Sequence, residues 1–91
     1  MAGDERVYVG SKPILAYVTA VVTSLFKSDS VRVMARGRSI SSAVDVVEVT
    51  MRSFLNDLVV DSIDIGTERL GEAGAERNVS TISIQLTKPK A

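Results

Sequence analysis

The chain has 91 residues, 45% of them apolar and 24% charged, which favours one globular domain over residues 1–91 rather than two domains or a disordered chain. Its 11 basic and 11 acidic residues cancel, which argues against a strongly basic nucleic-acid-binding protein that acts unaided. Cysteine and histidine are absent, which excludes a disulfide framework and a thiolate metal site and removes the commonest acid–base catalyst. No apolar run approaches the ~20 residues of a membrane span, and the first residues lack the pattern of a signal peptide, so we expect a soluble cytoplasmic protein.

The first two predicted elements are a strand and a helix. A short β-type run at 6–9 ends at Gly10, and Ser11 or Lys12 opens a helix with Pro13 in its first turn, where a missing N–H costs nothing. Apolar residues then recur at helical spacing as far as position 26. We expect these to form the buried stripe: Ile14, Leu15, Val18, Val21, Val22, Leu25 and Phe26.

The next two elements are a strand and a helix joined by a basic turn. Val31, Val33 and Ala35 alternate along one edge of the strand, and Gly37 permits a tight turn after it. Ser39 or Ser41 can cap a helix from about 39 to 55. The apolar face predicted for this helix is Ile40, Ala43, Val44, Val47, Met51 and Phe54.

Arg36 and Arg38 flank Gly37 at this corner, beside free backbone N–H groups and the positive end of a helix dipole. That arrangement suits a phosphate. The alternative is a solvated loop with two surface arginines.

Two further strands close the chain, at 59–65 and 79–87, with a flexible hairpin tip at 71–75. If they extend through Arg69 and Arg77, the hairpin projects beyond the core as an arm; the alternative is an ordinary hairpin. The order β-α-β-α-β-β predicts an α+β fold, a two-layer sandwich with a mixed four-stranded sheet and two helices. We expect flexible ends at 1–5 and 88–91.

Four segments in this order resemble the Alba (Sac10b) family of archaeal chromatin proteins, and the specific ones are Ala-Arg-Gly-Arg-Ser-Ile-Ser at 35–41 and Ala-Val-Asp at 43–45. The weaker ones are Gly-Ser-Lys-Pro at 10–13 and Val-Ser-Thr-Ile at 79–82. The resemblance spans about 7–88. It implies the fold of the C-terminal domain of a bacterial translation initiation factor, a dimer, and binding to double-stranded DNA, and often RNA, with little sequence preference. It also implies association with the chromosome.

The resemblance also implies site residues. The family's lysine pair falls on Ser11 and Lys12, so only the second lysine is kept. The first lysine is reversibly acetylated in some members, which leaves Lys12 as the candidate for that modification here. The signature arginines fall on Arg36 and Arg38. With Lys12, whose alternative is a plain helix-start lysine, they are expected to form one phosphate-binding patch per subunit.

Three more positions follow from the family's hairpin arm and its contact between dimers. Arg69 and Arg77 could contact the minor groove, although nearby glutamates make pairing within the hairpin a rival. The dimer–dimer phenylalanine falls on Phe54, for which core packing is the alternative. Tyr17 could lie near the patch or fill the core.

Four functions compete at this point. The leading one is an architectural chromatin protein that coats and compacts duplex DNA as a homodimer. The second is an RNA-binding protein, a chaperone or a ribonucleoprotein subunit. The neutral charge suggests a variant in which this chain pairs with a more basic paralogue. An enzyme would need a metal held by carboxylates such as Asp61 and Asp64, and nothing else in the chain supports that.

Overall fold

A computed structural model describes residues 5–89 of the chain. The elements follow the predicted order, with a short 3-10 helix (Gly37–Ser39) before the second helix. Their bounds are β1 (Glu5–Tyr8), α1 (Ile14–Lys27), β2 (Ser30–Arg36), α2 (Ile40–Ser53), β3 (Val59–Leu70) and β4 (Arg77–Thr87). None of the helices described is long and apolar enough to cross a membrane.

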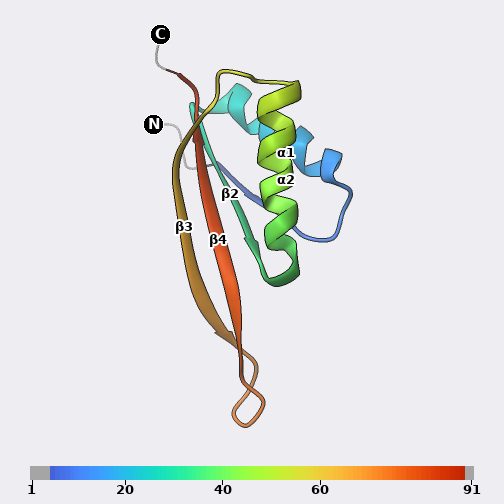
Figure 1. The fold of residues 1–91 in the computed structure, drawn as a ribbon, viewed down its shortest axis with the longest axis vertical. Helices are drawn as coiled ribbons and strands as arrows, with labels where there is room; N and C mark the ends of the chain where they lie inside the picture. The colour runs from blue at the N-terminus through green and yellow to red at the C-terminus, as the bar shows by residue number, and fades with distance from the viewer. Residues whose placement is uncertain (1–4, 90–91) are drawn as a thin grey trace.

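The strands form one mixed sheet in the order β1-β2-β4-β3. β1 and β2 are parallel, and β4 is antiparallel to both β2 and β3. Both helices lie on the same face of the sheet, so the molecule has two layers and the other sheet face is open (Figure 1). The α+β sandwich predicted from the element order is therefore confirmed.

The core lies between the helices and the covered sheet face. Alternation along β2 places Val31, Val33 and Ala35 in it, as predicted. The largest fully buried side chains besides those of β2 come from both helices and β4: Val18, Val21, Leu25, Val46, Thr50 and Leu86.

The predicted stripe of α1 was too wide. Leu15 is 63% exposed and Phe26 is 82% exposed, because they lie on the flank that faces neither the sheet nor α2. The predicted helix start was also wrong, since α1 begins at Ile14 with Pro13 at its N-cap position. The ring of Pro13 disfavours helical geometry at Lys12, so the helix cannot begin there.

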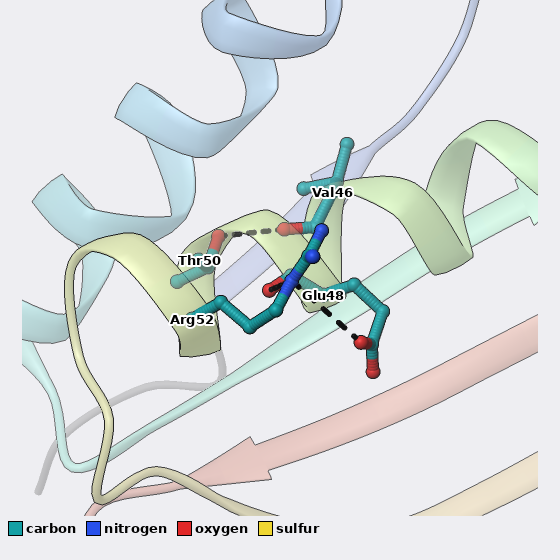
Figure 2. Close-up of polar contacts among 4 residues, drawn as sticks. All are labelled: Val46, Glu48, Thr50 and Arg52. Carbon is teal, nitrogen blue, oxygen red and sulfur yellow. Dashed lines mark hydrogen bonds and ion pairs between the residues drawn. The ribbon is translucent and has the colours of Figure 1, made fainter.

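The buried face of α2 includes two residues that were not predicted and leaves out one that was. Val46 and Thr50 are fully buried, whereas Val44 is exposed. Thr50 tolerates burial because its hydroxyl donates a hydrogen bond to the Val46 carbonyl at 2.7 Å. Figure 2 shows this bond, with the pair formed by Arg52 and Glu48 beside it.

The strands β3 and β4 are longer than the minimal prediction, and their hairpin extends past the helices and past β2 (Figure 1). The last β2 residue, Arg36, pairs with Thr81, which pairs with Gly66. From Thr67 to Leu70, β3 therefore has only β4 as a neighbour. The projecting arm considered from the sequence is present.

The ends of the described chain are fixed by hydrogen bonds. β1 begins at Glu5, which pairs with Val31, one residue earlier than expected. The Lys88 N–H donates to the Asp29 carbonyl at 2.8 Å. The remaining residues expected to be flexible, apart from Pro89, are 1–4 and 90–91, which lie outside the described residues.

Candidate nucleic-acid interface

The basic corner joins β2 to α2. Gly37 has φ of +57°, a left-handed geometry that an L side chain resists, and this turn reverses the chain directly after the strand. The flanking Arg36 and Arg38 are both exposed. The turn therefore presents two guanidinium groups to solvent at the start of α2, as the sequence predicted.

The start of α2 differs from the prediction in its capping. Ser39 occupies the N-cap position but has helical backbone angles and makes no side-chain cap hydrogen bond. A serine cap works from an extended backbone, so the 3-10 helix before α2 removes that option for Ser39. Ser41 lies inside the helix and is exposed.

The loop of Ser11 and Lys12 leaves the same end of the sheet as the corner. β1 and β2 are parallel neighbours, and the Val9 N–H donates to the Met34 carbonyl at 2.8 Å just before both loops begin. Ser11 and Lys12 are exposed. Parallel strands bring their carboxyl ends to one edge, so this loop and the basic corner share that edge.

Tyr17 anchors the loop from below. Its ring is buried in the core, and its hydroxyl accepts a hydrogen bond from the Lys12 N–H at 3.0 Å. A Cβ on Gly10 would lie 3.3 Å from that hydroxyl, so the loop packs tightly against it. Both roles considered for Tyr17 are therefore combined in one side chain.

Arg36 is not free at this corner. Its guanidinium forms an ion pair with Glu68 of β3 at 2.5 Å, across the open sheet face. The two side chains are exposed, so the pair can open at little cost. Within residues 5–89, Lys12 and Arg38 form no ion pair. Sequence reasoning missed the pairing of Glu68 with Arg36, which the register of the hairpin against β2 would have indicated.

The arm carries the other two predicted arginines. Arg69 pairs with Glu76 at 3.4 Å, so the rival considered from the sequence, pairing within the hairpin, applies to it. Arg77 stands opposite Leu70 and has no acidic partner among the described residues. The arm therefore offers one compensated and one uncompensated arginine.

Phe54 lies away from these groups. It is the C-cap residue of α2, at the opposite end of the helix from the basic corner, and it is 53% exposed. A 14-residue helix separates the two ends by about 20 Å. The alternative of core packing is therefore wrong for Phe54, and its surface is distinct from the patch.

Carboxylates do not gather into a metal site. Within residues 5–89, no group of three or more histidine, cysteine, aspartate or glutamate side chains could hold a metal ion. Asp61 and Asp64, the candidate metal ligands of an enzyme, lie on exposed β3. Two arginines instead flank an exposed turn, with the Lys12 loop at the same edge of the sheet, an arrangement suited to binding an anion.

The two-layer sandwich with a projecting hairpin is the fold of solved Alba proteins. The structure of Alba from Thermoplasma volcanium matches with a TM-score of 0.87 and 39% identity, covering 92% of this chain and 100% of that one. The crystal structure of ALBA1 from Trypanosoma brucei matches with a TM-score of 0.73 and 28% identity, covering 94% of this chain and 70% of that one.

Sequence comparison agrees with the structural one. The Alba family model matches residues 5–67. A protein of Methanothrix thermoacetophila named DNA/RNA-binding protein Alba is 54% identical over 90 residues, covering 97% of this chain and all of its relative. DNA/RNA-binding protein Alba 1 of Archaeoglobus fulgidus is 45% identical over 87 residues, covering 93% and 97% of the two chains. The chain belongs to the Alba family, whose members are named for binding and not for a reaction.

Proposed function

We propose that this chain is an architectural nucleic-acid-binding protein that, as a dimer, coats and compacts double-stranded DNA without sequence preference. Binding of nucleic acid is supported by the relatives named DNA/RNA-binding proteins. The observation that carries the duplex proposal is the exposed Arg36-Gly37-Arg38 corner beside the Lys12 loop. Contacts of this kind bind phosphates, which carry no base identity. In the cell we place the protein on the chromosome.

Dimerisation is supported by apolar side chains that the monomer leaves uncovered. Ile63 and Ile65 of β3 point to the helix-covered side of the sheet but remain exposed, as does Val44 of α2. A second copy would bury this strip, which otherwise places large apolar groups in water. A two-fold dimer presents two basic patches, each with its hairpin arm.

The zero net charge favours one variation of this assembly. A homodimer would carry two basic patches on a molecule whose charges, patches included, sum to zero, which limits its attraction to a duplex. A heterodimer with a more basic paralogue keeps the patches and adds charge. A mixed complex that binds duplex DNA no tighter than the homodimer would rule out this variation.

RNA is the second candidate partner, since the names of the relatives include it. The same arginines serve the phosphates of an A-form helix, and the arm could follow its wide minor groove. A competition between DNA and RNA duplexes of one sequence ranks the two partners.

A salt titration tests the proposed function. Affinity for a short DNA duplex should fall with salt at a log–log slope of about −0.9 for each phosphate contacted. The double variant Arg36→Ala and Arg38→Ala should flatten this slope by about two such contacts for each subunit. Arg52→Ala, which removes an exposed arginine of α2 paired with Glu48, is the matched control. Equal slopes for all three proteins would refute the patch.

Two further residues belong to the proposal. Phe54, exposed at the far end of α2, would contact a neighbouring dimer along the duplex. Phe54→Ala should leave the binding of one dimer intact and abolish cooperativity, so an unchanged isotherm would refute this contact. Acetylation of Lys12 would remove one phosphate-binding charge, and Lys12→Gln should weaken duplex binding accordingly.

A further inference from the structure

The open face of the sheet carries an aromatic side chain that the core does not require. Tyr8 of β1 is 63% exposed there. The register continues from Tyr8 to Met34, then to Ser83 and to Asp64, which places one side chain from each strand in a row across the sheet. The helices cover only the opposite face (Figure 1), so this row faces solvent.

A hollow accompanies the row. Next to it, on the arm side, Arg36 pairs with Thr81 and Thr81 with Gly66, which has no side chain. A Cβ at Gly66 would lie 3.2 Å from the Thr81 hydroxyl, so that space is open only because the residue is glycine. The resulting groove is lined by Tyr8, Met34, Arg36, Asp64, Gly66 and Ser83, among others.

Cations lie on both sides of the aromatic ring along the strands. Arg6 pairs with Arg32 two residues before Tyr8 and Met34, on the same open face. Arg32 donates to the Gln85 side chain at 3.1 Å, and Arg36 closes the other end of the groove. The spacing therefore offers phosphate-binding groups before and after an aromatic platform.

The floor of the groove suits a base better than a phosphate. The Asp64 carboxylate and the Ser83 hydroxyl can accept hydrogen bonds from the N–H groups of a base edge, whereas a carboxylate repels a phosphate. A base within a duplex is stacked and cannot lie on Tyr8. An unpaired base can, and open sheets with exposed aromatic side chains bind single strands in this way.

We propose that this groove binds an unpaired nucleobase of a single-stranded segment, with the base stacked on Tyr8 and the adjoining phosphate on Arg36. The phosphate takes the place of Glu68 on that arginine. This inference rests on the proposed function for the phosphate contact, and it adds a second binding mode that needs no duplex.

The first test compares single strands with duplexes. A labelled single-stranded oligonucleotide, as DNA and as RNA, is titrated with the protein and followed by fluorescence anisotropy. Tyr8→Ala should weaken single-strand binding about tenfold and leave duplex binding unchanged, while Tyr8→Phe keeps both. Phe26→Ala, which removes an exposed aromatic ring from α1, is the control and should change neither. Single-strand binding that survives Tyr8→Ala would overturn the proposal for that nucleic acid.

A second measurement needs no destabilising variant. The chain has two tyrosines and no tryptophan, and Tyr17 is buried. Stacking of a base on Tyr8 should quench the tyrosine emission of the protein, and Tyr8→Phe should remove that quenching. Emission that does not change on saturation with a single strand would overturn the stacking.

The outcomes separate the two proposals. If duplex binding depends on Arg36 and Arg38 while single strands bind independently of Tyr8, the groove fails and the architectural function stands. If single strands bind through Tyr8 and duplexes do not bind at low salt, the groove stands and the architectural function fails.

Discussion

Under the proposed function, Glu68 would compete with nucleic acid for the guanidinium group of Arg36, because the two side chains form an ion pair in the free protein. Glu68→Gln should release Arg36, so that duplex affinity rises and the log–log salt slope becomes steeper by up to about 0.9 for each subunit. The salt titration described above measures both effects.

The control for this change is Glu48→Gln. It removes the same charge from an exposed carboxylate that also has an arginine partner, Arg52, but lies on α2. A gain that is equal in the two variants would show that net charge, and not release of Arg36, sets the affinity.

The geometry of the basic corner depends on Gly37, whose backbone is left-handed. Alanine at φ of +57° should destabilise the protein by about 1 kcal/mol, because an L side chain strains the left-handed backbone. No steric clash adds to this cost, since its Cβ would lie at an ordinary 3.5 Å from Val79. Urea unfolding of Gly37→Ala against Ser41→Ala, an exposed control on α2, measures this cost. An unchanged midpoint would contradict the strain argument.

Burial that follows from the two-residue period of a strand was predicted correctly. Burial that depends on which elements pack against a helix was not. The alternation of Val31, Val33 and Ala35 places all three on one face of β2, because successive side chains of a strand point to opposite faces. The burial of Thr50 could not be predicted in this way, since it depends on a hydrogen-bond partner for the hydroxyl, which here is the Val46 carbonyl.

The two helices show the same limit. Leu15 and Phe26 fit the apolar period of α1, yet the sheet and α2 cover only one stripe of that helix. The turn and its two exposed arginines were predicted, because glycine between two arginines after a strand indicates a turn, but the cap expected from Ser39 was not. The pairing of Arg36 with Glu68 required the register of residues 32 positions apart.

The arm should bind through one of its two arginines more than through the other. Arg69 pairs with Glu76, whereas Arg77 has no acidic partner within residues 5–89. Arg77→Ala should therefore weaken duplex binding more than Arg69→Ala, by a few-fold at low salt. Each variant is the control for the other, and equal losses would show that the ion pair of Arg69 with Glu76 opens freely on binding.

The proposed dimer should depend on the exposed apolar side chains of β3. Ile65 is 83% exposed on β3, in the strip proposed to be covered by a second subunit. Ile65→Asp would place a charge in that interface and should shift the protein to a monomer in sedimentation velocity. Leu15→Asp adds the same charge at an exposed apolar site of α1 and should leave the dimer intact. If Ile65→Asp remains a dimer, the interface lies elsewhere.

The outer part of the hairpin has a consequence for how the protein moves. From Thr67 to Leu70 and from Arg77 to Ser80, each strand pairs with no strand but the other, and no side chain there is fully buried. Two strands without a packed face are marginally stable in water. These amides should exchange with deuterium long before those of β2, through opening that leaves the core folded. The binding free energy of a ligand that orders the arm must therefore offset the conformational entropy that the arm loses. Slower deuterium exchange in the arm would report binding even when the helices do not change.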